Sequence, residues 1–425
     1  MKNLKIGLFG FGCVGQGFYK VLENNGQTKS IAKIVVKDPS KSRPLPANRF
    51  VYNKQDILGD DSINLVVEVI DDADEAFEIV KTALSKGKAV VSANKKMIAT
   101  RLQELLNLQK QYKASFLYDA AICGSIPILR TVDSYFATDE IQSLQGIFNG
   151  TTNYILTRTA EGETYAQALE KAQQLGFAET DPTLDVEGFD PKYKLTLLLA
   201  QAFGVVVPPT EILNIGINRL LPLDVEFAEK RGYNIKLLAQ AQKAGSRLWG
   251  YVLPSFVSKK SRLFGVKNEY NAVWLQTKQA DGQFYEGKGA GSLPTGQAVA
   301  ADVLALAQGY SYQYPKLETT VPAYTNDKAL RVYLRYGDEA MSKKLGFVAD
   351  GVIHYAKGYY QSTGTVYIGE LLRNNAAQTE GLFIAALPEG EDENKFLDEE
   401  QTQRKKLLAY SALPLCINLM IKLWG

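Results

Sequence analysis

The sequence predicts an α/β protein in which a parallel, doubly wound sheet is followed by two α+β regions. Three observations support this fold class. Short apolar strands alternate with helical segments over residues 1–135, a glycine-rich turn joins the first strand to the first helix, and the alternation weakens after Pro127. A chain of 425 residues is long enough for two or three domains, which we expect to span 1–135, 136–320 and 321–425.

The first strand–turn–helix unit carries the pattern of a dinucleotide-binding site. Residues 5–9 form an apolar strand, residues 16–23 follow a helical pattern, and the turn between them reads G-x-G-x-x-G. This spacing suits a tight turn, the approach of a pyrophosphate to the backbone and close packing of helix on strand. A simple glycine turn is the alternative. We expect a Rossmann-type domain that binds its cofactor through Gly10, Phe11, Gly12, Cys13, Val14 and Gly15.

Further strands and helices complete the expected sheet. The strands are residues 31–36, 64–70, 89–91 and 115–118, and the helices are residues 73–86 and 100–112. Ligands of such sheets bind beyond the carboxyl ends of the strands. We therefore expect Ser92, Asn94 and Lys95 to lie at the cofactor crevice, with a surface position for Lys95 as the alternative.

The end of the second strand gives conflicting signals about the cofactor. Asp38 suits the ribose 2′-hydroxyl of NAD, whereas Lys37, Lys41 and Arg43 suit the additional phosphate of NADP. The same cations also fit a solvated loop. We expect NADP to be preferred and NAD to be tolerated.

Composition and charge exclude several classes of protein. The formal net charge is +2 and basic residues are mixed with acidic ones, so no basic face predicts nucleic-acid binding. The 3 scattered cysteines suggest a reducing compartment, and His354, the single histidine, excludes a His-cluster zinc site and suits a structural position on a strand. We see neither a membrane-spanning apolar run nor a signal peptide, and we expect a cytoplasmic protein.

The second and third regions have weaker patterns. We expect a strand over 143–148, helices over 154–159 and 164–175, several strands within 249–286, and a helix up to about 308 that opens at the glycine-rich turn 287–295. Beyond 320, strands are expected over 329–336, 351–361, 364–368 and 382–386, followed by a charged segment over 389–406 and a terminal helix over 407–424.

The segment 176–194 is the most informative part of the chain. Asp190 precedes Pro191, which predicts a helix with Asp190 as N-cap, and Lys194 then lies on the same face of the first turn. An apolar run follows Lys194, so its amine is expected at the edge of a core, where lysines transfer protons with shifted pKa values. A capping aspartate paired with a helix lysine is the structural alternative.

Five blocks together resemble the homoserine dehydrogenase family, and they cover about residues 1–320. They are Gly10–Gly15, Ser92–Lys95, Gly150–Leu156, Glu179–Lys194 and Gly289–Thr295. The resemblance implies reversible reduction of L-aspartate 4-semialdehyde to L-homoserine with a nicotinamide cofactor, a step of threonine and methionine biosynthesis. An ammonium that stabilises the developing alkoxide and then supplies its proton is the chemistry that such a reduction needs.

The resemblance also implies roles for individual residues. Lys194 resembles the general acid, Asp190 its partner in the hydride-transfer site, and Lys95 the lysine near cofactor and substrate. Glu179 resembles the residue that binds the α-ammonium of the substrate. Gly150 and Thr151, at the start of a helix, are expected to contact the substrate, and Gly291 lies in a turn expected to pass close to the cofactor.

Other implied features depart from the family pattern. The family has a sodium-like cation site, matched here by Asp119, Ile122, Gly124 and Ile126, with Asp119 in place of a glutamate. Asp71 and Asp72 replace glycines near the cofactor. The C-terminal region resembles a diverged ACT-like regulatory domain that lacks the usual turn after its first strand, and we expect a homodimer. Another amino-acid oxidoreductase on this scaffold, or a non-catalytic nucleotide-binding sensor, are the alternative functions.

Overall fold

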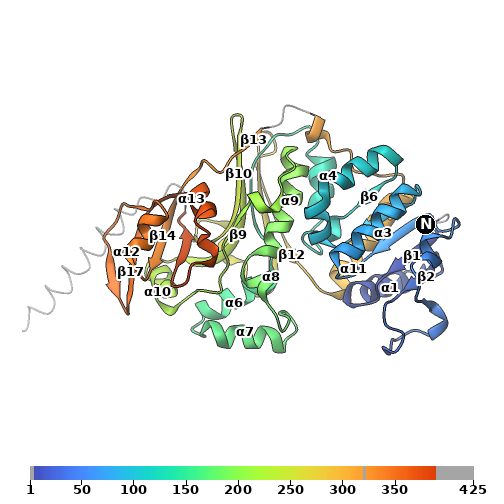
Figure 1. Cartoon of the computed structure of the whole chain (residues 1–425), viewed down its shortest axis with the longest axis horizontal. Coiled ribbons are helices and arrows are strands. Elements are labelled where there is room, and N and C mark those ends of the chain that lie inside the picture. The colour runs from blue at the N-terminus through green and yellow to red at the C-terminus, as the bar shows by residue number, and fades with distance from the viewer. Residues whose placement is uncertain (1–3, 319–321, 389–425) are drawn as a thin grey trace, which may run out of the picture.

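The computed structural model describes residues 4–318 and 322–388. Figure 1 shows three regions in a row, with the N-terminal sheet at one end, a long twisted sheet in the middle and the C-terminal elements at the other end. Among the described residues, no helix combines the length and the apolar character needed to cross a membrane. The segments 389–406 and 407–424, for which the sequence suggested a charged stretch and a terminal helix, lie outside the described residues.

The N-terminal region is built on a six-stranded parallel sheet of order β3-β2-β1-β4-β5-β6. Its strands are β1 (Ile6–Phe9), β2 (Ile31–Val35), β3 (Phe50–Val51), β4 (Leu65–Glu68), β5 (Ala89–Ser92) and β6 (Phe116–Leu117). Its helices are α1 (Cys13–Asn24), α2 (Gln55–Leu58), α3 (Ala73–Ser85) and α4 (Lys95–Tyr112). Both β1 and β4 are buried along their whole length, as expected for parallel strands covered on both faces. This confirms the predicted Rossmann-type sheet.

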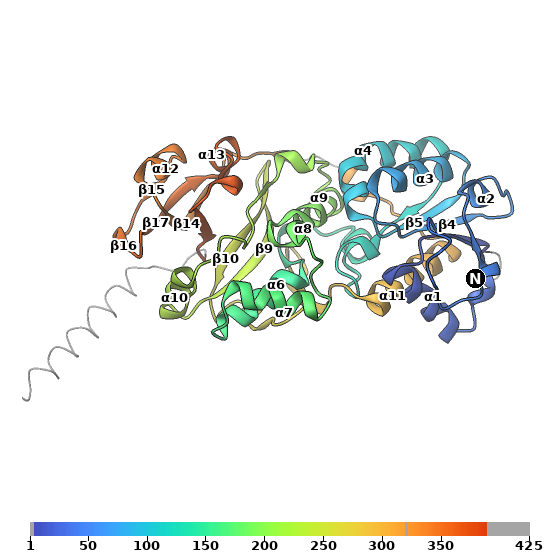
Figure 2. The same cartoon turned by 60° about the horizontal axis from the view of Figure 1, so that its bottom comes forward.

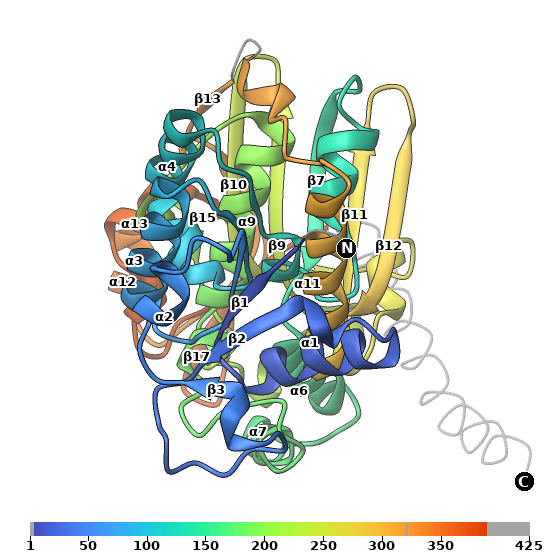
Figure 3. The same ribbon diagram turned by 90° about the vertical axis from the view of Figure 1, so that its right-hand side faces the viewer.

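Helices cover the two faces of this sheet, α3 and α4 on one and α1 on the other (Figure 2). The face with α1 also receives α11 (Ser292–Ala307), which comes from much later in the chain. The two helices approach so closely that a Cβ on Gly17 would lie 1.8 Å from the carbonyl oxygen of Ser292. The glycine-rich turn 287–291 is thereby brought beside the N-terminus of α1, as Figure 3 shows from the N-terminal side.

The middle and C-terminal regions share one mixed sheet of order β12-β11-β7-β9-β10-β18-β14-β17-β15. The middle strands are β7 (Ile141–Ile147), β8 (Leu213–Asn214), β9 (Asn234–Ala244), β10 (Arg247–Val257), β11 (Tyr270–Thr277), β12 (Gly282–Lys288) and β13 (Ala323–Tyr324). The middle helices before α11 are α5 (Ile128–Arg130), α6 (Gly150–Ala160), α7 (Tyr165–Gln174), α8 (Thr183–Val186), α9 (Phe189–Phe203) and α10 (Pro222–Lys230). Helix α9 lies between the two sheets, because it packs against α4 on one side and against β9 and β10 on the other.

The C-terminal region has the element order βαβββαβ and an apolar core. It contains β14 (Ala329–Tyr336), α12 (Glu339–Lys344), β15 (Val348–Ala349), β16 (His354–Ala356), β17 (Tyr359–Tyr367), α13 (Ile368–Arg373) and β18 (Phe383–Ala386). Strand β18 pairs in parallel with β10 through Ser255 and Ala386, so this region continues the middle sheet.

Three local predictions differ from the structure. Asp190 is not an N-cap: Gly188, with a φ of +81°, caps α9, so that the helix begins at Phe189 and the carboxylate of Asp190 is free for other partners. The helix expected from residue 100 begins at Lys95, because the side chain of Asn94 caps it by accepting from Met97 N. A single strand over 351–361 is wrong, because Lys357 and Gly358 both have positive φ and turn the chain between β16 and β17.

Candidate functional site

The first turn of α9 places a buried carboxylate and a buried ammonium side by side. Asp190 and Lys194 are 4% and 6% exposed. They are four residues apart, and the distance from Lys194 Nζ to Asp190 Oδ2 is 2.7 Å. The same Nζ donates to the carbonyl oxygen of Phe148, at the end of β7, over 2.6 Å. The predicted pair is therefore present, and its ammonium is fixed between a carboxylate and a carbonyl.

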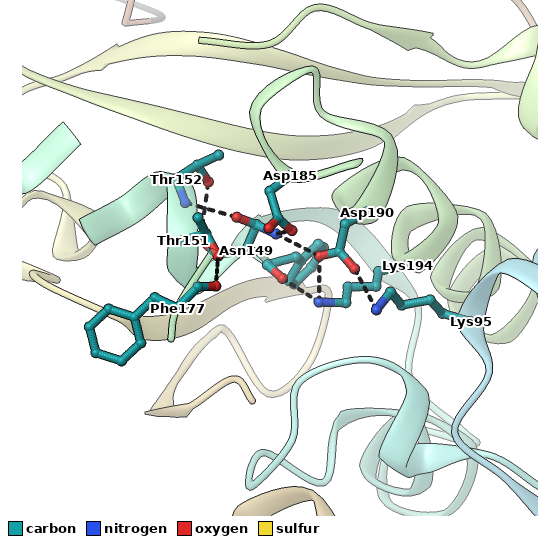
Figure 4. A network of polar contacts seen from close by, with 9 residues as sticks. Lys95, Asn149, Thr151, Thr152, Phe177, Asp185, Asp190 and Lys194 are labelled. Carbon is teal, nitrogen blue, oxygen red and sulfur yellow. Dashed lines mark hydrogen bonds and ion pairs between the residues drawn. The ribbon is translucent and has the colours of Figure 1, made fainter. Parts of the chain in front are cut away.

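A second lysine, from the N-terminal region, also lies against Asp190. Lys95, the first residue of α4, places its Nζ 2.9 Å from Asp190 Oδ1 (Figure 4). The lysine follows β5, so it extends beyond the carboxyl end of the parallel sheet, where ligands of such sheets bind. Its side chain is 40% exposed, whereas that of Lys194 is 8% exposed. Asp190 thus bridges a partly exposed and a buried ammonium at the junction of the two sheets.

Two residues that the sequence did not single out complete the polar network. The side-chain amide of Asn149 donates to Asp190 Oδ2 over 2.9 Å and to Asp185 Oδ1 over 2.7 Å (Figure 4). Its oxygen accepts from Thr152 N and so caps α6. Asp185 comes from the short helix α8, which the turn at Gly188 folds back against α9. Asn149 therefore links the two carboxylates, which belong to one short segment, to the start of a separate helix.

The charges in this network determine its protonation. Burial raises the pKa of the Asp190 carboxyl, but Lys194, Lys95 and the amide of Asn149 outweigh it and hold the pKa well below its usual range. The pKa of Lys95 is raised, most strongly by Asp190 and more weakly by Asp185 and Glu179. Burial and the neighbouring charge of Asp190 raise the pKa of Asp185. At neutral pH the centre of the site is an ionised carboxylate between cations.

The residues predicted to bind substrate lie around this network. Glu179 is exposed on the turn after α7, where its backbone carbonyl accepts from Gln173 Nε2. Its negative charge contributes to the raised pKa of Lys95. Gly150 and Thr151 form the first turn of α6, directly after Asn149. The hydroxyl of Thr151 donates to the carbonyl oxygen of Phe177 over 2.6 Å, so this side chain also fixes the chain that leads to Glu179.

The predicted cofactor turn is tightly packed at its first glycine and open at its second. Gly10 has a φ of +95° and a Cβ there would lie 2.6 Å from the carbonyl oxygen of Val69, whereas a Cβ on Gly12 would meet nothing within 4 Å. Open space thus lies in front of Gly12, at the N-terminus of α1. Val14 and Gly15 continue into the helix, and Phe11 packs its ring edge-on against Phe50 and Tyr19.

A second glycine turn approaches the first. Gly291 caps α11 with a φ of +119°, and the next residue, Ser292, donates its hydroxyl to the carbonyl oxygen of Cys13 over 2.8 Å. The two glycine turns therefore lie next to each other.

At the end of β2 the acid is tied to its own loop. Asp38 is exposed, and its Oδ1 accepts from the backbone nitrogen and hydroxyl of Ser40 over 2.8 and 2.7 Å. Lys37 is also exposed, and the guanidinium of Arg43 lies over the ring of Phe50 at 5.4 Å. The cations are present at the edge of the crevice, and the carboxylate that would favour NAD already has partners.

Ser92, predicted to contact cofactor, is fully buried and donates its hydroxyl to Glu68 Oε2 over 2.5 Å. Glu68 ends β4, and its other oxygen accepts from Ile70 N over 2.8 Å. Burial raises the pKa of Glu68 to about 7, and the two hydrogen bonds offset only part of this effect. The pair joins the carboxyl ends of two neighbouring strands directly beneath the loops of the crevice.

Replacing Glu68 by Gln should make the stability of the protein less sensitive to pH. Folding raises the pKa of this acid from 4.5 to about 7, so the folded state loses stability as the pH rises through that interval. One pH unit within it corresponds to about 1.4 kcal/mol. Urea unfolding at about pH 6 and pH 8.5 tests the idea, with Glu75→Gln on the exposed face of α3 as control. Equal losses of stability in native protein and Glu68→Gln would contradict it.

The loop proposed to hold a cation contains a buried acid cluster. Asp119 Oδ1 accepts from Leu129 N over 2.8 Å, and the backbone nitrogen of Asp119 donates to Asp302 Oδ2 over 3.0 Å. Arg130 lies 2.5 Å from the other oxygen of Asp302. Burial and the charge of Asp302 raise the pKa of Asp119 to about 7, and burial raises the pKa of Asp302 to about 6.

The carbonyls assigned to this site, those of Ile122, Gly124 and Ile126, follow Asp119 in the same loop. A Cβ on Gly124 would lie 2.7 Å from the carbonyl oxygens of Lys288 and Gly289, so the loop packs against the second glycine turn. Within the part of the chain that the structure describes, His, Cys, Asp and Glu side chains form no group of three that could hold a metal ion.

Two family models match long segments of this chain. Residues 10–119 match the family model described as "Homoserine dehydrogenase, NAD binding domain", and residues 127–304 match the model described as "Homoserine dehydrogenase". The chain is 32% identical over 378 residues to a homoserine dehydrogenase of Bacillus subtilis, covering 84% of this chain and 87% of that protein.

Solved structures give the same result. A homoserine dehydrogenase from Thiobacillus denitrificans aligns with a TM-score of 0.77 and 28% identity over 91% of this chain and 98% of that one. A mutant of a hyperthermophilic archaeal homoserine dehydrogenase in complex with NADPH aligns with a TM-score of 0.63 and 26% identity, covering 73% of this chain and 99% of the archaeal one.

Proposed function

The chain belongs to the homoserine dehydrogenase family. We propose that its buried Lys194 exchanges the proton of the reacting oxygen, and that Asp190 and Lys95 fix the position of Lys194. The protein is an NAD(P)-dependent oxidoreductase of amino-acid biosynthesis that interconverts L-homoserine and L-aspartate 4-semialdehyde. The observation that carries the proposal is the carboxylate of Asp190 between two ammonium groups, one from α4 and one from α9.

In the reductive direction negative charge develops on the aldehyde oxygen, and the nicotinamide supplies the hydride. An ammonium within hydrogen-bond reach stabilises that charge and then delivers a proton to it. Lys194 is suited to this role, because Phe148 and Asp190 fix its nitrogen and leave one of its three protons for the substrate. Lys95 is the more exposed of the two lysines and lies on the cofactor side, where it orients Asp190 and adds positive charge beside the reacting oxygen.

Negative groups on the other side of the network suit the amine of the substrate. We assign the α-ammonium to Glu179, with the nearby carboxylate of Asp185 contributing to the same negative potential. The substrate carboxylate is assigned to the first turn of α6 at Gly150 and Thr151, since a helix N-terminus attracts anions. An aldehyde between these two ends would lie beside Lys194.

We propose that NADP is the preferred cofactor and NAD a tolerated one. Lys37, Lys41 and Arg43 follow β2, where the 2′-phosphate of NADP would lie, and Asp38 is engaged by Ser40. The archaeal relative in complex with NADPH has the same overall fold, which supports this assignment. The glycine turns at Gly12 and Gly291 would hold the pyrophosphate, and Ser92 would act through Glu68 beneath it.

We also propose a monovalent cation such as sodium at Asp119, Ile122, Gly124 and Ile126. Asp119 and Asp302 face the single guanidinium of Arg130, so a cation held by the loop carbonyls and Asp119 would compensate the remaining negative charge. Such a cation would rigidify the loop beside the second glycine turn. A higher unfolding temperature in sodium chloride than in choline chloride at equal ionic strength is the expected sign of binding.

The assembly and division of labour are proposals of the same kind. We assign residues 1–135 to dinucleotide binding, 136–320 to catalysis and dimerisation, and 321–425 to a regulatory domain, in a cytoplasmic homodimer. The C-terminal region alternates strands with two helices in the order β14-α12-β15-β16-β17-α13-β18, and this α+β arrangement supports an ACT-like domain. Sedimentation of the purified protein would test the dimer.

The test of the function is a steady-state assay of homoserine oxidation with NADP and NAD in turn. We expect turnover with both cofactors and a higher kcat/KM with NADP, because of the cations after β2. Aspartate should not replace homoserine, since it lacks the hydroxyl that Lys194 would deprotonate. Oxidation of aspartate but not of homoserine would overturn the assignment.

A further inference from the structure

A short segment, residues 213–218, lies between the candidate site and the C-terminal region. It contains β8, which pairs in parallel with β10 through Leu213–Tyr251 and Asn214–Val252. The segment is far in the sequence from both of its neighbours. One side contacts the C-terminal region and the other contacts the turn that carries Asp185 and Asp190, so the segment connects the two.

One side of the segment belongs to the core of the C-terminal region. The side chains of Leu213 and Ile215 are buried in the cluster formed by Leu330, Val332 and Ile384 of β14 and β18 together with residues of β10 and α13. Successive residues of a strand point to opposite faces. Asn214 therefore points the other way, toward α9.

The other side of the segment holds the chain that carries the site carboxylates. Asn214 is 8% exposed, its Nδ2 donates to the carbonyl oxygen of Glu187 over 2.8 Å, and its Oδ1 accepts from Lys192 Nζ over 2.7 Å. Glu187 lies between Asp185 and Asp190, and Lys192 lies in the first turn of α9. One side chain thus ties both ends of the turn that brings the two carboxylates together.

Backbone contacts reinforce this side. Ile217 N donates to the carbonyl oxygen of Val186 over 2.7 Å, and Asn218 Nδ2 donates to Glu187 Oε1 over 3.3 Å. A Cβ on Gly216 would lie 1.9 Å from the carbonyl oxygen of Val186, so the two chains lie in direct contact. Movement of the segment would therefore move residues 186–188 with it.

The C-terminal region also binds residues 219–224, which directly follow the segment. Arg335 of β14 is 1% exposed and its Nε lies 3.0 and 3.1 Å from the two oxygens of Asp224, at the start of α10. Its Nη2 donates to the carbonyl oxygen of Arg219 over 2.6 Å. Tyr333 OH donates to the same carboxylate over 2.9 Å. A buried, multiply bonded ion pair holds residues 219–224 to the C-terminal strands.

We propose that Asn214 is a positioning residue through which the C-terminal region sets the placement of Asp185 and Asp190. The proposal rests on the function proposed above, because it matters only if those carboxylates serve the reaction. The C-terminal region contacts residues 213–224 on one side. On the other side, Asn214 bonds the turn 185–190, so a shift of residues 213–224 would also shift this turn. A change in the C-terminal region thereby reaches Lys194 and Lys95 through Asp190.

The first experiment compares Asn214→Leu with the native protein and with Asn326→Leu. Asn326 also bonds a backbone carbonyl, that of Glu211, but it contacts no residue of the turn 185–190 in the described structure. Asn214→Leu should lower kcat for homoserine oxidation about tenfold, since small misplacements of reacting groups are costly. The Kd for the dinucleotide, whose turns lie in the other sheet, should not change. The control should keep native kcat. If Asn214→Leu does not purify folded, Asn214→Ser, which leaves room for Lys192, takes its place.

The second experiment tests whether the effect comes from the C-terminal region. Arg335→Lys keeps the charge but loses the planar guanidinium that bonds Asp224 and Arg219 together. It should lower kcat about threefold in the native background and cause no further loss in Asn214→Leu, because coupled residues are not additive. If the losses of kcat in the two variants multiply in the double variant, the positioning role of Asn214 is overturned. A native kcat in Asn214→Leu would overturn it as well. The assay of native protein separates the two proposals. If native protein does not oxidise homoserine, the proposed function is wrong. If it does, the results for the variants decide the positioning role of Asn214 alone.

Discussion

Replacing Lys194 by Met should lower kcat for homoserine oxidation about 10³-fold, which is the size of effect expected when a general acid–base and its charge are both removed. Methionine has a similar length but carries no proton to exchange and no positive charge for the developing alkoxide. The Kd for the dinucleotide should remain near its native value, because Lys194 lies on α9 and bonds Phe148 and Asp190, which are outside the glycine turns. Steady-state kinetics and equilibrium cofactor titration together measure both quantities.

Lys236→Met is the matched control for this variant. Lys236 is 3% exposed and, like Lys194, donates to a backbone carbonyl and to a side-chain oxygen, those of Val266 and Asn153. Its removal tests the cost of deleting a buried lysine outside the site. The control should retain native turnover in its folded population. Turnover by Lys194→Met within tenfold of native would show that another group moves the proton, with Lys95 as the next candidate.

The sequence predicted those features of the site that depend on residues close together in the chain. Asp190 and Lys194 were correctly paired, because a spacing of four residues fixes two side chains on one helical face wherever the helix lies. The sheet was predicted for a similar reason, since buried parallel strands such as β4 and β5 are short, continuous apolar runs. Such local signals do not depend on tertiary packing.

Contacts between distant segments left no comparable signal. Asn149 lies 36 and 41 residues from the carboxylates that it joins, and periodicity says nothing about that distance. The sequence pointed only to Gly150 and Thr151, the first two residues of the helix that Asn149 caps. The position of Lys95 after a strand predicts its place at the carboxyl end of the sheet, and the resemblance implies its role, but no spacing rule predicts its contact with Asp190 across α4 and α9. Asp190 was misplaced as an N-cap because Gly188 ends the preceding turn and starts α9 early.

Replacing Asp190 by Asn should damage both turnover and stability, because it leaves two ammonium groups facing a neutral amide. Removing one partner of a buried ion pair costs about 3–5 kcal/mol. The pKa of Lys95 should fall, since the charge of Asp190 is what raises it most. We expect kcat to fall about 10²-fold, less than for Lys194→Met because the proton-carrying group remains but is misplaced.

The pH dependence separates this electrostatic role from simple loss of packing. The pKa of Asp190 is held below its usual range, so its contribution to stability is complete above its unfolded pKa of about 3.9 and is lost as the pH falls toward the folded value. The stability gap between native protein and Asp190→Asn should thus stay constant from pH 8 to about pH 5 and shrink at lower pH, in urea unfolding.

Asp133→Asn is the control for this variant, because Asp133 is 2% exposed and accepts hydrogen bonds from Gln201, Tyr310 and two backbone nitrogens, none of which is a cation. It should lose stability and keep the kcat of its folded population. The site residues behave differently if the network is electrostatic: turnover of Asp190→Asn should stay low even where the variant is fully folded. Recovery of native kcat in that folded population would mean that the two lysines need no anion between them, and the roles given to Asp190 and Lys95 would have to be withdrawn.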